Sequence, residues 1–369
     1  MFFTFFTKKH LPKLSFCFLL VAALLLAYPY PCLADSLKKE MIITAVGDIM
    51  MGSHFPSEDW LPEDDGASLF KDVIPFLKKS DIVFGNLEGC LLNQGDCIKK
   101  CKNPESCYAF KMPEHYVDHL VNAGFNLVSI ANNHIGDFGK NGIESTGRVL
   151  SKAGIHFAGV HTQPNTIFEL NGTMIGFCAF SPNQAAPDLR DMDNAQRIVE
   201  LLNGMCDIVI VSVHAGAEGE KNRHVTRQTE IFHEEDRGNV YAFAHKMVDA
   251  GADVILGHGP HVTRAVELYK GRLIAYSLGN FCTYGRFNLK SNNGIAPILR
   301  IKMNTEGVFI EGSLVSVFQK PKKGPSIDPK NRAVNEVIEL TSQDFPETNL
   351  SINSHGKITI KNVSNSPKP

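Results

Sequence analysis

Residues 125–134 have the sequence FNLVSIANNH, in which an apolar run rich in β-forming residues, Phe125 to Ile130, ends in two asparagines and a histidine. A run this short, bounded by turn-forming residues, predicts a buried strand. Helical patterns flank it: Pro113 to Ala123 opens with a proline, and Gly142 to Lys152 precedes the next apolar run, Ile155 to Val160. Strands that alternate with helices in this way indicate βαβ units and a mostly parallel sheet.

The alternation extends in both directions along the chain. Its other expected members are strands at 41–46, 82–84, 207–213 and 254–256 and helices at 69–79, 195–202 and 240–250. Three hairpins interrupt it, at 166–180 around Asn171-Gly172, at 266–278 around Lys270-Gly271, and at 295–317. The first half therefore looks parallel and the last third antiparallel. The sequence predicts a layered α/β fold with ligands beyond the carboxyl ends of the strands.

Separate segments are expected at the two ends of the chain. Residues 1–34 have a basic start, an apolar run from Leu14 to Tyr28 and small residues before Asp35, which is typical of a secretory signal peptide. An uncleaved membrane anchor is the alternative. The predicted organisation is a signal peptide at 1–34, a main domain at 35–319 with a Cys-rich insertion at 90–107, an extension with one short helix and one strand at 320–361, and a loose tail at 362–369.

The composition is that of an ordinary globular protein, with 43% apolar and 21% charged residues among 369. It excludes a disordered or collagen-like chain. Without residues 1–34, which hold three lysines and no acidic residue, the formal charge is −5. Polyphosphate backbones repel an acidic chain, and no Lys/Arg cluster is interleaved with aromatic residues. The sequence therefore argues against nucleic acid as a partner.

Four of the nine cysteines crowd into one short polar segment. They are Cys90, Cys97, Cys101 and Cys107. In an exported protein such a cluster is expected to form two disulfides that pin a loop, and the sequence does not fix their pairing. The alternative, a four-thiolate metal site, lacks the paired C-x2-C spacing.

Polar side chains follow the predicted strands at five successive ends. They are Gly47-Asp48, Asn86 with Glu88, Asn132-Asn133-His134, His214 with Glu218 four residues further on, and His258 with His261. Each has an ordinary explanation alone, such as a turn after a strand or an exposed loop histidine. Because the carboxyl ends of parallel strands share one edge, the joint pattern instead indicates that these groups converge.

Carboxylate, imidazole and amide ligands together suit a divalent metal such as Mn, Fe or Zn, and the scarcity of thiolates disfavours structural zinc. Two such ions about 4 Å apart would clamp a phosphoryl group and activate a water, so the sequence points to metal-assisted hydrolysis. Two other histidines, His115 and His119, lack the glutamate of an H-E-x-x-H motif and are expected on a solvated face. The charged stretch 218–237 is expected to be a mobile loop over the sheet edge.

Five strings resemble those of the poly-γ-glutamate capsule-biosynthesis (CapA) family. They are TAVGDIMMG at 44–52, GNLEGCL at 85–91, SIANNHIGDFGKNGIEST at 129–146, VSVHAGAEG at 211–219 and GADVILGHGPHVTRAVELYKGRLIAYSLGNF at 251–281. The likeness is most specific in the last string. That family is similar in fold to calcineurin-like metallophosphatases, which implies two mixed β-sheets sandwiched together and flanked by helices, with a metal centre at the strand ends.

The resemblance also implies roles for particular residues. Six positions match metal ligands: Asp48, Glu88, Asn133, His214, His258 and His261. His134 matches the histidine that protonates the leaving group. The resemblance implies a catalytic role for Asp48 as well. Four more residues are expected to contact substrate: Asn86, Glu218, Tyr276 and Asn280.

Three departures from the phosphatase pattern bear on the number of metal ions. Met50 stands where the pattern has a histidine, with His54 the nearest imidazole. Asn86 replaces the bridging aspartate unless Glu88 takes the bridge, and the last motif is His-x-x-His, not His-x-His. The resemblance therefore implies one or two divalent ions.

Taken together, these patterns predict an exported protein of the periplasm or cell surface that serves capsule or poly-γ-glutamate biosynthesis. Its site would hydrolyse, transfer or hold an anionic polymer or a phosphoester. A non-enzymatic alternative is a polymer-binding or assembly subunit of a membrane synthase, and a third is a hydrolase unrelated to polymers. Turnover decides between the first two, and substrate profiling would expose the third.

Overall fold

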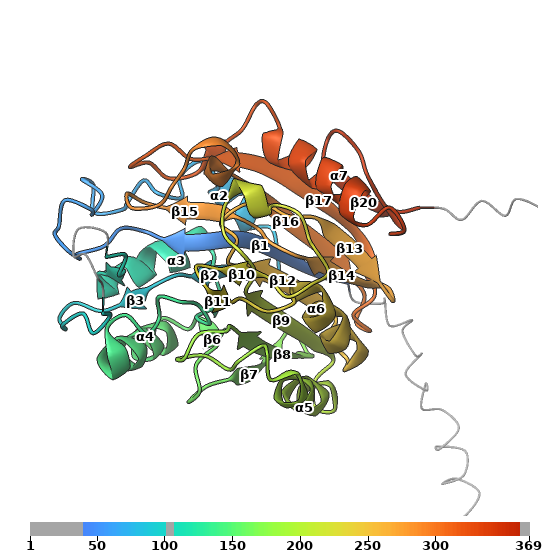
Figure 1. Ribbon diagram of the computed structural model, residues 1–369, viewed down its shortest axis with the longest axis horizontal. Coiled ribbons are helices and arrows are strands. Elements are labelled where there is room, and N and C mark those ends of the chain that lie inside the picture. Colours follow the sequence, from blue (N-terminus) through green and yellow to red (C-terminus); the bar gives the residue numbers. More distant parts are fainter. Residues whose placement is uncertain (1–39, 101–106, 362–369) are drawn as a thin grey trace, which may run out of the picture. The chain divides into compact units, whose positions relative to one another are not determined.

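The computed structural model describes residues 40–100 and 107–361 (Figure 1). The predicted signal peptide at 1–34, Cys101 and the predicted tail at 362–369 lie outside the described residues. Two large β-sheets and the helices on their outer faces make up the described part of the chain, which is the layered α/β fold that the sequence predicts. Among the helices described, none has the length and apolar character needed to cross a bilayer.

The first sheet has ten strands, and its central path runs β19-β20-β17-β16-β1-β2-β5-β6. Its strands are β1 (Met41–Met50), β2 (Ile82–Leu87), β5 (Leu127–Ser129), β6 (His156–Ala158), β15 (Asn280–Thr283), β16 (Ile295–Met303), β17 (Phe309–Phe318), β18 (Ser326–Ile327), β19 (Leu350–Ile352) and β20 (Lys357–Ile360). β1 is parallel to β2 and antiparallel to β16, so the parallel and antiparallel halves meet at β1. Beyond Ala45 the partner of β1 on that side changes from β16 to the parallel β15.

The second sheet has the order β13-β14-β12-β9-β8-β7. Its strands are β7 (Asn165–Leu170), β8 (Thr173–Phe180), β9 (Ile208–His214), β12 (Val254–His258), β13 (Val266–Tyr269) and β14 (Arg272–Ala275). The four central strands are parallel, and each edge is an antiparallel hairpin. The predicted turn at Asn171-Gly172 joins β7 to β8, and both its residues have positive φ, as a type I′ turn needs.

Alternating side chains of the strands fill three apolar cores. Ile43 of β1 and Ile210 of β9 belong to the core between the two sheets. Val46 of β1 faces the opposite way, into a core shared with α3, and Val211 of β9 faces a core shared with α5 and α6. Burial of each such side chain contributes about 1.5–3 kcal/mol. The sheets are therefore held face to face, which fixes the strand ends relative to one another.

Within residues 40–100 and 107–361, six α-helices lie against the sheets. They are α2 (Ile74–Leu77), α3 (Val117–Ala123), α4 (Gly139–Lys152), α5 (Met192–Asn203), α6 (Val240–Asp249) and α7 (Arg332–Asp344). Asp191 and Asn239 cap the N-termini of α5 and α6 by accepting backbone N–H bonds. α7 packs on β16 and β17, and the segment after it forms β19 as well as the expected strand at β20.

The helix predicted at 69–79 is the largest error in secondary structure. Leu69, Phe70, Val73 and Leu77 are buried, as the helical spacing indicates, but only Ile74–Leu77 is α-helical. The preceding residues form successive turns, such as Leu69 N–H to Gly66 O and Val73 N–H to Phe70 O. Pro75 has no N–H to donate and disfavours the helical conformation of the residue before it, which restricts the helix.

The stretch at 218–237 is also more structured than the sequence predicts. It contains a 3-10 turn, Glu220–Asn222, and a short hairpin formed by β10 (Ile231–Phe232) and β11 (Glu235–Asp236). Glu230 binds the fully buried guanidinium of Arg264 through both carboxylate oxygens, at 2.8 and 2.7 Å. This ion pair ties the loop to Arg264, two residues before β13. The expected mobility of the loop stays a prediction.

The four crowded cysteines do not form two disulfides. Cys90 and Cys97 carry free thiols, whereas Cys107 is disulfide-bonded. Cys90 is fully buried in β3 (Cys90–Leu91), which pairs with β4 (Lys111–Met112), and its Sγ lies 3.2 Å from the carbonyl oxygen of Ile135. Cys97 packs against the same apolar core. Packing in the core, rather than cross-linking, therefore accounts for these two thiols.

Candidate metal centre

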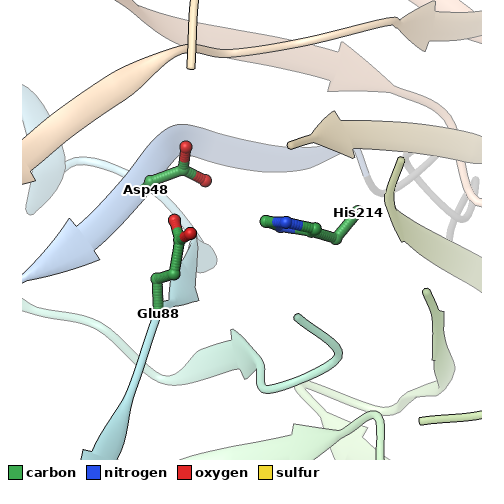
Figure 2. A group of neighbouring side chains, drawn as sticks. All are labelled: Asp48, Glu88 and His214. Carbon is green, nitrogen blue, oxygen red and sulfur yellow. The ribbon is translucent and has the colours of Figure 1, made fainter. Parts of the chain in front are cut away.

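The carboxyl ends of strands from both sheets meet at one place. In the second sheet His214 of β9 and His258 of β12 are paired in register. In the first sheet Asp48 of β1 is paired with Asn86 of β2, and Glu88 follows directly after β2. Figure 2 shows Asp48, Glu88 and His214 pointing toward one another across the gap between the sheets. The convergence predicted from the sequence is thus what the structure shows for these residues.

Asp48 is held in place by its backbone. Its N–H donates to Gly279 O at 2.8 Å, and the pairing of β1 shifts register at this residue. A Cβ atom on the preceding residue, Gly47, would lie 1.8 Å from Gly279 O, so only glycine fits there. The close approach of these two backbone segments turns the Asp48 carboxylate, which is completely buried, toward the second sheet.

Three neighbouring side chains contact the Asp48 carboxylate. Asn86 Nδ2 donates to Oδ1 at 2.9 Å, and His261 Nδ1 lies 2.9 Å from Oδ2. His258 Nδ1 is 3.3 Å from Oδ1 but is out of line for a hydrogen bond. A carboxylate, an amide and two imidazoles that are far apart in sequence therefore share one small volume.

Several buried ligand atoms in this volume have no hydrogen-bond partner among the described residues. They are both carboxylate oxygens of Glu88, Nε2 of His214, Oδ1 of Asn133 and both ring nitrogens of His258. Burial of an ionised or polar group without a partner is costly, by several kcal/mol for a carboxylate. One ligand atom from each of Asp48, Glu88 and His214 lies within 4.8 Å of the others. These oxygen and imidazole donors fit a divalent cation.

The electrostatics of the site agree with a missing positive charge. Burial raises the pKa of Glu88 well above its usual value, and the neighbouring Asp48 raises it further. Burial would lower the pKa of His261, but Glu88 and Asp48 beside it raise it to about 10. Burial would raise the pKa of Asp48, but contacts with His258 and His261 outweigh it and the net shift is downward. Asp48 and Glu88 therefore favour a positive charge at this point of the site.

His214 has the opposite environment. It is completely buried, and this burial lowers its pKa well below the usual value. A neutral imidazole is the form that binds metals. Its Nδ1 lies 3.4 Å from Asn86 Nδ2, which leaves Nε2 to face the site.

The structure distinguishes between Asn86 and Glu88 for the bridging position. Both amide atoms of Asn86 are engaged, since Nδ2 donates to Asp48 and Oδ1 accepts from Asn132 at 3.1 Å. Glu88 keeps both oxygens free of hydrogen bonds within the described part of the chain. Glu88 is therefore the residue able to contribute a second carboxylate. Asn86 positions Asp48, and both atoms of its amide are already used in hydrogen bonds.

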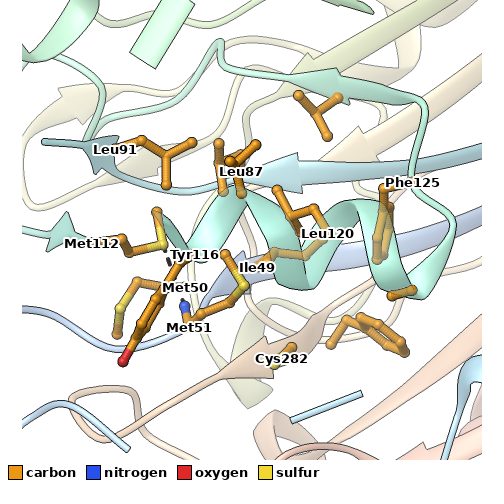
Figure 3. Packing of buried hydrophobic residues seen from close by; sticks show 14 of the residues in the cluster. Ile49, Met50, Met51, Leu87, Leu91, Met112, Tyr116, Leu120, Phe125 and Cys282 are labelled. Carbon is orange, nitrogen blue, oxygen red and sulfur yellow. Dashed lines mark hydrogen bonds between the residues drawn. The ribbon is translucent and has the colours of Figure 1, made fainter. Parts of the chain in front are cut away.

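The phosphatase pattern has a histidine where this chain has Met50, and no residue close to Met50 in the sequence takes its place at the metal centre. Met50 packs into the apolar core beside Ile49 and Leu120 (Figure 3). His54 lies 3.7 Å from the exposed Glu58. The structure therefore brings neither residue to the metal centre.

His134 lies at the edge of the centre, next to Asn133. Its Nε2 is 4.0 Å from Glu88 Oε1, and its Nδ1 is 2.7 Å from Asp137 Oδ2. Asp137 also forms an ion pair with Lys99 at 3.1 Å. Burial lowers the pKa of His134, although Asp137 opposes this. Asp137 fixes the imidazole with one nitrogen toward the site, in the way that a carboxylate orients a catalytic histidine.

Asn280 acts on the backbone of His261. His261 has a φ of 55°, in the left-handed region that non-glycine residues rarely adopt. Two side-chain amides, those of Asn280 and Asn293, each donate to its carbonyl oxygen at 3.2 Å. These bonds hold the strained residue in the conformation that points its ring at Asp48 and Glu88.

A cavity of about 510 Å³ opens over the centre. Asn133, His134, His261, Glu218 and Asn280 line it, which places five of the predicted residues on its wall. Tyr276 does not reach it. Its hydroxyl donates to Glu267 at 2.7 Å and its ring stacks on Phe345 at 5.0 Å, in the core outside the second sheet. The predicted contact of Tyr276 with substrate is therefore not supported by its position.

Three residues that the sequence reasoning did not select also belong to the site. Asp137 and Lys99 orient His134, and Arg237 lines the cavity with its side chain 4% exposed. Asp137 had a usable signal, because it follows His134 by one turn within the quoted string NNHIGD. Lys99 and Arg237 had none, because each lies in a polar stretch between the motifs.

Comparison with known proteins agrees with the motifs. The sequence profile described as "Bacterial capsule synthesis protein PGA_cap" matches residues 42–284. The chain is 27% identical to the capsule biosynthesis protein CapA of Bacillus anthracis over an alignment 376 positions long, which covers 91% of this chain and 84% of that protein. It is 30% identical to the PGA biosynthesis protein CapA of Bacillus subtilis over 253 aligned residues, which cover 64% of this chain and 61% of that protein.

Among solved structures, the chain is similar to a putative 5′-nucleotidase from Staphylococcus aureus. The TM-score is 0.40 at 11% sequence identity, and the alignment covers 79% of this chain and 53% of that one. A likeness at this level carries no argument about activity.

Proposed function

Since the chain belongs to the bacterial capsule synthesis protein family PGA_cap, we propose that it serves the synthesis of an anionic capsule polymer through a divalent-metal centre. The polymer would be poly-γ-glutamate or one of similar charge. The metal centre would act on the polymer or on a phosphoester. One observation carries the proposal: buried ligand atoms of Glu88 and His214 lack hydrogen-bond partners among the described residues, within 4.8 Å of Asp48.

The proposed ligands come from both sheets. They are Asp48, Glu88, Asn133, His214, His258 and His261. A divalent ion such as Mn, Fe or Zn held by them would polarise a phosphoryl or carbonyl oxygen and lower the pKa of a water. The six residues offer carboxylate, amide and imidazole atoms to one or two ions. Asn86 keeps Asp48 in position, and Asn280 does the same for His261.

His134 is proposed as the general acid. Asp137 accepts a hydrogen bond from Nδ1 and stabilises the doubly protonated ring, so that Nε2–H can be given to a departing oxygen in the cavity. His134 is buried apart from the side that lines the cavity, where a departing oxygen would lie. Lys99 balances the charge of Asp137 through Oδ1, and its Nζ also lies 3.5 Å from His134 Nδ1.

Metal content tests the proposal directly. The purified protein, supplied with Mn or Zn, is expected to retain metal after dialysis, and His214→Ala and His258→Ala are expected to lose it. His224→Ala is a matched control, because His224 binds Asp344 and lies outside the candidate centre. Unchanged metal content in both site variants would refute the ligand assignment. Metal-dependent cleavage of aryl phosphoesters or of poly-γ-glutamate would then show that the site is catalytic.

A binding role without turnover is the second candidate function. Basic side chains such as Lys99, Arg237 and Arg286 line the cavity and suit the carboxylates of a polymer. A second cavity, of about 730 Å³, shares Lys99 and Asn133 with the first, so an extended chain has room to continue past the centre. Retention of poly-γ-glutamate without any cleavage in the presence of Mn would favour this function, with a membrane synthase as the natural partner.

Export is proposed from residues 1–34. Their basic start and apolar run suggest that they direct the chain to the periplasm or cell surface, where capsule polymer is assembled. A fusion lacking residues 1–34 is expected to stay in the cytoplasm, whereas the full chain is expected in the exported fraction. Equal distribution of both forms would contradict this.

A further inference from the structure

Arg237 combines deep burial with incomplete hydrogen bonding. Its side chain is 4% exposed, and Nη1 donates to Glu218 Oε1 at 3.1 Å. Nε and Nη2, which form the other edge of the guanidinium, donate to no described residue although both atoms are buried. Buried charged groups are almost always paired, so an unpaired edge of this kind calls for an explanation.

The backbone around Arg237 is fixed, so the free edge is not the product of a loose loop. Arg237 N–H donates to Glu230 O at 2.8 Å, and its carbonyl accepts from Gly216 N–H at 3.0 Å. Glu230 in turn forms the buried ion pair with Arg264 and accepts from Ala217 N–H at 2.8 Å. These bonds therefore tie two segments together: the loop that follows His214, the last residue of β9, and the segment that carries Arg237.

Arg237 faces the same cavity as the candidate metal centre. His134, His261 and Asn133 line this cavity with it. Its charge also reaches the centre: it partly opposes the rise that burial causes in the pKa of Glu88, and it adds to the fall that burial causes in the pKa of His214. A ligand that reaches the metal ligands from the cavity therefore passes within the field of an unpaired guanidinium edge.

The chemistry of that edge selects the ligand. Two parallel N–H groups on one side of a guanidinium match the two oxygens of a carboxylate or a phosphoryl group. Arg286, whose Nη1 is also buried without a partner among the described residues, lines the same cavity. Its guanidinium lies over the rings of Tyr108 and Trp60, at 5.0 and 5.6 Å. Arg237 and Arg286, with Lys99, thus give the cavity several separate cationic points, as a ligand with more than one anionic group requires, while Glu218 and Glu235 line the same wall.

We propose that Arg237 binds an oxyanion of the substrate in bidentate fashion through Nε and Nη2, beside the metal centre, and so selects oligo-anionic substrates. This proposal extends the proposed function. It depends on that function in one respect, because it takes the cavity to be the substrate site. Carboxylate and phosphoryl groups share the required chemistry. The two sources are therefore distinguished by the probe that binds.

The test is a binding measurement at known metal content. Wild type, Arg237→Gln and Arg237→Lys are titrated with inorganic phosphate and, separately, with poly-γ-glutamate, in Mn-loaded and in EDTA-treated protein. Calorimetry gives the affinity, and Trp60, the single tryptophan of the chain, reports on the cavity through Arg286. Arg148→Gln is the matched control, because Arg148 is exposed and pairs with Glu114 away from the cavity.

Arg237→Gln is expected to bind the probe roughly 10- to 100-fold more weakly than wild type, with unchanged metal content, since it loses two charge-assisted hydrogen bonds. Arg237→Lys is expected to fall between the two, because an ammonium keeps the charge without the paired edge. Binding of phosphate alone assigns a phosphoester, and binding of poly-γ-glutamate assigns the polymer. Arg148→Gln is expected to match wild type.

Two results would overturn the inference: affinity of Arg237→Gln within twofold of wild type, or no binding of either probe by wild type. If Arg237→Gln does not fold, Arg237→Lys decides in its place, and unchanged affinity there is equally negative. Failure of the proposed function looks different. In that case the protein holds no metal, yet oxyanion binding by EDTA-treated protein still depends on Arg237.

Discussion

The side-chain amide of Asn86 donates a hydrogen bond to Asp48 Oδ1 at 2.9 Å, so a neutral residue stands next to the first candidate metal ligand. The charge at the centre is therefore set by Asp48 and Glu88 together with the histidines, without a third carboxylate from β2. We therefore expect the number and affinity of ions at the proposed centre to respond to a single change of amide to acid at this position.

Asn86→Asp is expected to lower the melting temperature of metal-free protein and to increase the stabilisation by added Mn. The new carboxylate lies at hydrogen-bond distance from Asp48, where like charges repel unless a cation separates them. Thermal melts with and without Mn measure both effects. Asn335→Asp, on the exposed face of α7, is the control, and an equal response in the two variants would contradict the proposed centre.

Asp137→Asn is expected to retain metal while changing the state of the His134 ring. Asp137 holds Nδ1 at 2.7 Å, and loss of its charge removes the orientation and the stabilisation of the protonated ring. ¹⁵N NMR of the imidazole should show an altered Nδ1 signal, and any hydrolytic activity should fall by roughly 10- to 100-fold. Asp118→Asn, exposed on α3, is expected to change neither. An unaltered His134 spectrum would show that Asp137 does not position the ring.

Arg264→Leu is expected to destabilise the protein by about 3–5 kcal/mol, because it leaves Glu230 buried without its partner. The double variant Arg264→Leu with Glu230→Leu is expected to recover much of that loss, since no buried charge remains unpaired. Urea unfolding of the two variants gives the comparison. Equal stability of the single and double variants would mean that the ion pair does not anchor the 218–237 segment.

Asp253 gives a prediction on pH. It is buried immediately before β12, where burial raises its pKa to about 6, although the hydrogen bond from Val209 N–H and the charge of Arg272 act to lower it. The folded state therefore binds a proton more tightly than the unfolded state, and the stability from this group is lost as pH rises from about 4 to about 6. The shift corresponds to about 2–3 kcal/mol.

Urea unfolding between pH 4 and 7 tests this prediction. Asp253→Asn is expected to show a smaller fall in stability with rising pH than wild type, because the amide does not ionise. The exposed Asp249→Asn is expected to keep the wild-type slope. Parallel curves for wild type and Asp253→Asn would rule out a raised pKa at this position.

The order of strands and helices could be predicted from the sequence because it depends on local patterns of apolar and turn-forming residues. Short apolar runs bounded by turn residues fixed β2, β5, β9 and β12, and the polar residues at their ends were visible as motifs. Where the local signal was ambiguous, prediction failed. The spacing of Leu69, Phe70 and Val73 reported burial correctly, but Pro75 restricted the helix that such spacing favours.

The chemical types present at the strand ends, and hence the family and the expectation of a divalent metal, were determined by the sequence alone. The tertiary structure decided which atoms face the centre. It turned the Asn86 amide to Asp48, left both Glu88 oxygens without hydrogen bonds among the described residues, and directed Tyr276 into the outer core. It also placed Arg237 on the cavity wall. The reason is physical: a motif fixes the backbone nearby, whereas the direction of a side chain depends on packing against residues far away in the sequence.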